Sequence, residues 1–229
     1  MNFEEFIKAV LPLVGVGVGF LLSERASKKR SEILALESDK KKIEYTLGLL
    51  YAESVRLDMW LKTVVRSKNL LIERELNFAF PKAPLIEWDY KYVATVQSVY
   101  PNIIVDLFNV SSGVDDLKNV IDRINADLKL HFDRLCRQNL SIEEADFTPF
   151  YLQYSVMLEL VLGVLREIDK ISNRLVRSGE DYFSKHQHIL NPNKLNMLCM
   201  KKSENTVCEA GKLLSTLKTL SGVDNKNAA

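Results

Sequence analysis

Metal ligation is the chemistry that the residue types near the carboxyl end of the sequence would support. His186 and His188 precede Cys199 and Cys208, and imidazole and thiolate groups are the ligands that zinc prefers. Their spacing matches neither a Cys-x-x-Cys pair nor a His-Glu-x-x-His helix. We therefore expect no metal centre here and interpret the histidines as solvent-exposed residues near a turn.

Other catalytic patterns are missing from the sequence as well. After residue 22 every glycine stands alone, so no glycine-rich loop is available to hold a phosphate. There is no Gly-x-Ser-x-Gly elbow, and the spacing of the carboxylates singles out no acid–base pair. The sequence therefore predicts a protein that is not an enzyme and that has no cofactor.

The composition limits the class of partner and the kind of fold. The 229 residues include 31 Lys and Arg against 30 Asp and Glu, a balance that argues against nucleic acid as a partner. Only nine glycines and six prolines occur over this length, which favours long helices over many short strands. Three cysteines, an odd number, show no disulfide framework and indicate a reducing compartment.

An apolar run near the amino end, "AVLPLVGVGVGFLLSERASKKR" at residues 9–30, has the properties of a membrane anchor. Residues 9–23 carry no charge, and the run reaches the lower length limit for a spanning helix if it begins at Phe6 and Lys8 extends to the headgroups. Glu4 and Glu5 have the wrong sign for a signal peptide, and no cleavage site follows.

Four cations directly follow the apolar run, and we call them the basic collar: Arg25, Lys28, Lys29 and Arg30. By the positive-inside rule they place the amino terminus outside and the bulk of the chain in the cytoplasm. The sequence thus predicts a single-pass membrane protein whose first partner is membrane lipid. Two alternatives stay open, an interfacial or buried soluble helix and a cleaved signal peptide.

Small residues at Gly15, Gly19 and Ser23 lie four apart and so share one face of this helix. Small-xxx-small spacing lets two membrane helices approach closely, so this face predicts self-association into a homo-oligomer. The alternative is that glycine is simply common in membrane helices, and Gly17, off the row, favours that view.

The segment that follows the anchor, residues 24–68, has a near-heptad apolar pattern. The pattern predicts one long helix packed on at least one other helix, and an unbroken run from the membrane would make it a stalk. The seam positions are Ile33, Leu36, Ile43, Leu47, Leu50, Leu57, Leu61 and Val64, with Lys40 and Ser54 as polar interruptions.

Residues 69–101 form a less regular insert with half of the prolines and many aromatic residues, among them Trp88, Tyr90 and Tyr92. We expect a helix that starts near Pro84, because no partner strand is evident for a sheet. We expect the aromatic cluster to cap a bundle core, with a ligand groove as the alternative.

Two further long helices are predicted at 102–138 and 149–178, the second ending at Gly179. The apolar first half of the second helix could cross a membrane, but its polar residues favour a buried bundle helix. Short helices and a disordered tail complete the chain.

Together these features predict an all-α fold: a single N-terminal transmembrane helix followed by a cytoplasmic antiparallel bundle of long heptad-patterned helices. The predicted segments are an anchor at 1–23, a juxtamembrane helix at 24–68, the insert at 69–101, the bundle at 102–222 and a tail at 223–229. The expected function is that of a membrane-anchored interaction or scaffold protein for an unidentified protein partner. The alternative is a membrane-acting effector, a defence or toxin component that oligomerises through its anchor and perturbs the bilayer.

Overall fold

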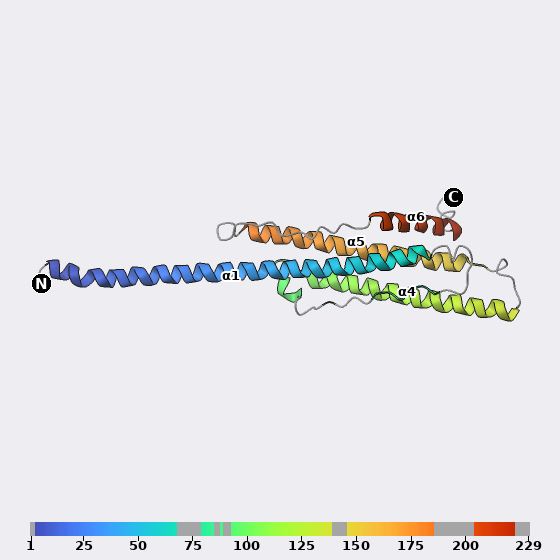
Figure 1. Ribbon diagram of the computed structural model, residues 1–229, viewed down its shortest axis with the longest axis horizontal. Coiled ribbons are helices and arrows are strands. Elements are labelled where there is room, and N and C mark those ends of the chain that lie inside the picture. The colour runs from blue at the N-terminus through green and yellow to red at the C-terminus, as the bar shows by residue number, and fades with distance from the viewer. Residues whose placement is uncertain are drawn as a thin grey trace.

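A computed structural model describes residues 3–67, 79–84, 88, 93–138, 146–185 and 204–222, and it describes side chains of the first helix at residue 16 and from residue 18 onward. The elements are α1 (Phe3–Arg66), η1 (Ala94–Val96), α4 (Ile103–Gln138), α5 (Thr148–Ser184) and α6 (Glu204–Leu220). No strand occurs in these ranges, so the prediction of an all-α fold is confirmed for them (Figure 1).

Helix α1 is a single element of 64 residues, about 95 Å long at the standard rise. It runs on without a break because no proline interrupts the chain between Pro12 and Pro81. The predicted seam is buried from Leu36 to Val64, and the polar seam residue Ser54 is buried with it. In Figure 1 the first half of α1 extends beyond the other helices.

Helix α5 lies at the centre and packs against α1, α4 and α6. It is long and apolar enough to cross a membrane, the one helix in the described ranges that is, and 56% of its apolar window is buried inside the protein. A core helix with neighbours on several sides is hydrophobic around much of its circumference. The composition of α5 is thus explained by the packing of its neighbours.

Two hydrogen bonds give the direction of α5 relative to α1. The Tyr182 hydroxyl, near the end of α5, donates to an Asp39 carboxylate oxygen at 2.9 Å. The Tyr154 hydroxyl, near the start of α5, donates to the Val64 carbonyl oxygen at 2.8 Å, close to the end of α1. The two helices are therefore antiparallel.

Helix α4 runs antiparallel to α5 in the same way. Arg174 forms an ion pair with Asp106 at 3.3 Å, near the start of α4, and the Gln153 amide donates to Asp127 at 2.8 Å, further along α4. It follows that α1 and α4 run parallel to each other, which differs from the predicted antiparallel bundle. The physical reason is that α4 begins at the level of the middle of α1 and not beside the end of α1, where a tight turn would place it. We call the chain between the two helices the crossing segment.

The predicted helix that starts near Pro84 falls largely on residues outside the described ranges. Residues 81–84 and 88 are not helical, whereas Val93 is helical and the 3-10 turn η1 follows it. Proline removes a backbone donor and disfavours helical geometry in the residue before it, which accounts for the absence of helix at 81–84.

The predicted end of α5 at Gly179 is also wrong, because the helix continues to Ser184. Gly179 is buried in the helix, and Tyr182 beyond it bonds to Asp39 while its ring meets Phe183 edge-on at 5.3 Å. These contacts hold the last turn in place and outweigh the helix-ending preference of glycine.

Candidate functional site

The amino-terminal half of α1 stands away from the rest of the protein. Residues 18–32 are all exposed, and Leu36 is the first buried residue of the helix. The described part of the chain therefore provides no core for residues 18–32.

Large apolar side chains cover this exposed helix around its circumference. Val16 is 72% exposed and Phe20 is 69% exposed, and Val18, Leu21 and Leu22 are each at least half exposed. Phe20, Leu21 and Leu22 are consecutive, and consecutive helical residues point about 100° apart. An apolar surface that surrounds a helix needs a covering medium or partner, since soluble proteins rarely leave such surfaces open to water.

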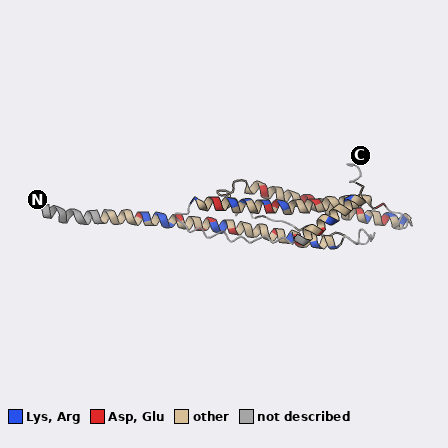
Figure 2. Cartoon of the chain, turned by 90° about the horizontal axis from the view of Figure 1, so that it is seen from above, with Lys and Arg blue, Asp and Glu red and all other residues tan. Residues whose placement is uncertain are grey.

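The basic collar follows on the same helix, one turn beyond the apolar residues. Arg25, Lys28, Lys29 and Arg30 are all exposed. Figure 2 shows these cations as a blue band directly after an uncharged stretch of α1. The order along the helix, apolar surface and then cations, is the order that a membrane interface requires.

The predicted packing face lies on the exposed part of α1. Gly19 and Ser23 are exposed, and nothing lies within 4 Å of the position that a Cβ atom would take at Gly19. Gly15 belongs to α1, but its surroundings are outside the described residues. The face is therefore open at Gly19 and Ser23 to a second helix.

The aromatic insert is part of the core and lies apart from the exposed helix. Trp88 is buried within the main hydrophobic cluster, together with Phe80. Tyr90 and Tyr92 lie outside the described residues. Of the three aromatic residues Trp88, Tyr90 and Tyr92, the structure thus describes Trp88 alone, as a core residue.

Polar side chains that the sequence did not single out fix the insert to the core. The Asn125 amide of α4 both accepts from the Phe80 backbone N–H at 2.7 Å and donates to the Phe80 carbonyl oxygen at 3.0 Å. The Trp60 indole N–H donates to the Pro81 carbonyl oxygen at 3.1 Å. Asn125 satisfies an extended backbone as a neighbouring strand would, and no sequence pattern signals such a contact.

Of the metal-ligand residue types named above, His186, His188 and Cys199 lie outside the described residues, and Cys208 is exposed on α6. Among the described residues no three His, Cys, Asp or Glu side chains lie together in a way that could hold a metal ion.

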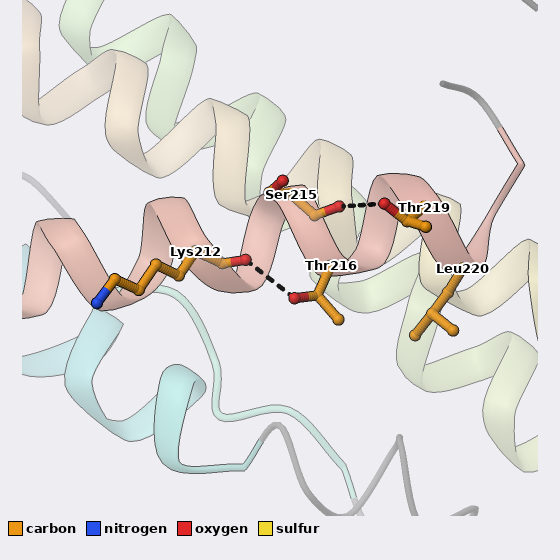
Figure 3. A pocket seen from close by; sticks show the side chains of 5 residues that line it. All are labelled: Lys212, Ser215, Thr216, Thr219 and Leu220. Atoms are coloured by element: carbon orange, nitrogen blue, oxygen red, sulfur yellow. Dashed lines mark hydrogen bonds between the residues drawn. The ribbon is translucent and has the colours of Figure 1, made fainter. Parts of the chain in front are cut away.

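A surface hollow lies along one side of α6 (Figure 3). Its lining comes from one helix alone: Lys212, Ser215, Thr216, Thr219 and Leu220. The Thr216 and Thr219 hydroxyls donate to carbonyl oxygens one turn earlier in the same helix, at 3.1 and 3.2 Å. A small-molecule site encloses most of its ligand and directs several polar groups at it, and this hollow does neither.

The candidate site is therefore the exposed amino-terminal half of α1, where an apolar surface is followed by the basic collar. Comparison with known protein families, with curated proteins and with solved structures finds no match to this chain.

Proposed function

We propose that this protein is a membrane-anchored helical interaction protein whose helical core acts at the cytoplasmic face of a membrane. The observation that carries the proposal is the exposed apolar surface of α1 at Val16 to Leu22, followed directly by the exposed basic collar. Hydrocarbon is the medium that such a surface fits, because a helix satisfies all of its backbone hydrogen bonds internally.

In the proposed arrangement, residues 6–23 of α1 span the hydrocarbon with the amino terminus outside. The collar lies among the headgroups, where anionic lipid contributes about 1 kcal/mol per cation. Between Ser23 and Leu36 the helix rises by roughly 20 Å. The core is therefore held clear of the membrane surface and is accessible to protein partners.

Carbonate extraction combined with protease protection tests this proposal. The full chain, expressed in cells, is expected to stay in the carbonate-resistant pellet, with its core digested only when protease reaches the cytoplasmic side. Release of the wild-type chain into the carbonate supernatant, or protection of the core from cytoplasmic protease, would show the proposal to be wrong.

A matched pair of substitutions separates anchoring from general effects of charge. Val16→Arg places a cation near the middle of the span, at a cost of about 2.5–3.5 kcal/mol for insertion, and is expected to release protein into the supernatant. Leu34→Arg serves as the control, because Leu34 is 58% exposed on the same helix but lies beyond the collar. Equal extraction of both variants would contradict the proposal.

A membrane-acting effector is the second candidate, favoured by the open packing face at Gly19 and Ser23. In this case assembly through the anchor would permeabilise the bilayer. Expression with a membrane-impermeant dye tests it: dye entry that Gly19→Leu abolishes would support the effector, and unchanged permeability on expression of the wild-type chain would eliminate it.

A further inference from the structure

A second apolar row runs along α1 on the side opposite the core, and we call it the outer row. Its members recur at heptad spacing and are exposed or half-exposed: Tyr45, Gly48, Ala52, Val55 and Met59. Met59 is 63% exposed and Val55 is 39% exposed, whereas Leu50, Leu57 and Leu61 on the inner side are fully buried. The described core therefore uses one side of α1 and leaves an apolar seam on the other.

The middle of the outer row allows a close approach of another helix. Nothing lies within 4 Å of the Cβ position at Gly48, and its neighbour on the row is the small residue Ala52. Larger side chains lie on both sides, Tyr45 before and Met59 after. Small residues at the centre of a heptad seam, flanked by larger ones, suit packing of two helices along their length.

The heptad frame of the outer row continues into the exposed half of α1. Because α1 is one unbroken helix, steps of seven residues back from Val55 lead to Leu34, Ser27 and Phe20, all of them exposed. Gly19 and Ser23 do not fall on these positions, so the packing face of the anchor is distinct from the outer row.

The charges beside the outer row distinguish between the two directions in which a second α1 could pack. With Tyr45, Ala52 and Met59 as a positions, the g positions carry Glu37, Glu44 and Asp58, and the e positions carry Lys42 and Arg56. In a parallel pair each g residue faces an e residue of the other helix, which brings Glu37 opposite Lys42. An antiparallel pair in the register that places Gly48 opposite Ala52 would instead bring Glu44 opposite Asp58 and Lys42 opposite Arg56.

We propose that two copies of this chain associate in parallel and in register through the outer row of α1. The occupant of the outer row is thus a second copy of the same helix. The inference rests on the proposed function in one respect: anchors inserted in the same direction into one membrane keep the two α1 helices parallel. Lys41, exposed on the same face, favours one register at a cost in stability.

Oxidative cross-linking of the full chain in native membranes tests the interface. In a background with Cys136, Cys199 and Cys208 replaced by Ser, either Gly48→Cys or Met59→Cys is introduced. A disulfide requires Cα atoms within about 7 Å, so cross-linking reports close approach of the two helices. Each variant is expected to give a covalent dimer with itself, and Asn119→Cys, on the exposed surface of α4, is expected to stay monomeric.

Mixing two differently tagged variants tests the direction. A parallel pair joins like positions, so Gly48→Cys joins with Gly48→Cys. An antiparallel pair in the register with Gly48 opposite Ala52 would instead join Gly48→Cys of one copy to Ala52→Cys of the other, a third variant made in the same background. Predominance of that mixed product overturns the proposal, as does a dimer yield no higher than that of Asn119→Cys.

Carbonate extraction and cross-linking of the same membranes distinguish a failure of the anchor from a failure of the pairing. Carbonate-resistant protein that fails to cross-link would overturn the pairing and leave the anchor in place. Protein that cross-links but is extracted by carbonate would overturn the anchor and keep the pairing.

As a charge control, Glu37→Lys is expected to lower the yield of the Met59→Cys dimer, and adding Lys42→Glu is expected to restore it.

Discussion

The hydroxyl of Tyr154 reaches the backbone carbonyl oxygen of Val64 at 2.8 Å and so joins the start of α5 to the end of α1. Tyr154 is fully buried, and its ring packs against Phe80 of the crossing segment with 4.8 Å between the ring centroids. Three segments distant in sequence thus meet at one side chain, which makes Tyr154 a sensitive position for tests of the fold.

Replacement of Tyr154 by Phe keeps the ring and removes the hydrogen bond. We expect the free energy of unfolding to fall by about 1 kcal/mol. The Val64 carbonyl oxygen loses the hydrogen bond from the Tyr154 hydroxyl but still accepts one from the backbone N–H of Ser67. The measurement is the urea midpoint of the full chain in detergent. Tyr51→Phe, at a half-exposed position of α1, is the control and is expected to change the midpoint little.

The same residue predicts how stability depends on alkaline pH. Burial raises the pKa of Tyr154 above its ordinary value of 10.0, so the folded state retains the phenol proton after the unfolded state has lost it. The resulting stability is fully present below pH 10 and is lost as the pH rises above it. Urea midpoints measured across this range should fall less steeply for Tyr154→Phe than for the wild-type chain, and an identical slope would contradict the assignment.

Replacement of Gly113 on α4 and of Gly163 on α5 by alanine is expected to change the stability of the protein in opposite directions. A Cβ atom at Gly113 would meet the Val164 Cγ2 atom at 2.9 Å, whereas nothing lies within 4 Å of that position at Gly163. Alanine improves helix propensity by about 1 kcal/mol at either site, but valine is stiff at χ1 and cannot easily move aside. We expect Gly163→Ala to raise the melting temperature and Gly113→Ala to lower it, as followed by circular dichroism.

Glu53 is a buried carboxyl group on α1 and is expected to cost stability at neutral pH. Burial raises its pKa above 4.5, while the nearby Arg56 lowers it by a smaller amount, and the Oε2 atom accepts no hydrogen bond from the described residues. The stability from a raised carboxyl pKa is present below 4.5 and is lost as the pH rises through the folded-state value.

We therefore expect Glu53→Gln to stabilise the protein at neutral pH by on the order of 1 kcal/mol and to lose this advantage near pH 4. Urea unfolding at the two pH values measures the difference. Glu32→Gln, at an exposed position of the same helix, provides the comparison. An advantage of the same size at both pH values would show that the charge of Glu53 is not its cause.

The parts of the fold that follow from local spacing could be predicted from the sequence. The seam of α4 from Leu107 to Leu128 is buried as the three-four spacing predicts, because the period of an α-helix alone decides which side chains share a face. The same holds for the inner side of α1. The outer row could not be predicted from the sequence, because two of its members, Gly48 and Ala52, are too small to mark an apolar seam.

Features that depend on long-range contacts could not be predicted. The parallel directions of α1 and α4 are defined by contacts with α5 that are distant in sequence, and Phe80, between the two helices, is held by the side chain of Asn125. The continuation of α5 past Gly179 likewise depends on Asp39, far away in the sequence. In both cases contacts between distant residues outweigh local preference.

Helix α1 is continuous from its exposed half into the core, so the exposed half and the core move together as one rigid body. Roughly 50 Å of rigid helix precede Leu36, so a tilt of about 10° at the far end corresponds to a displacement of roughly 9 Å there. No hinge separates this arm from the core, so a rotation or tilt imposed on the arm turns the core with it. In the membrane arrangement proposed above, a mismatch between the spanning segment and the hydrocarbon thickness can be accommodated by tilting. Such a tilt of α1 would reorient the entire core.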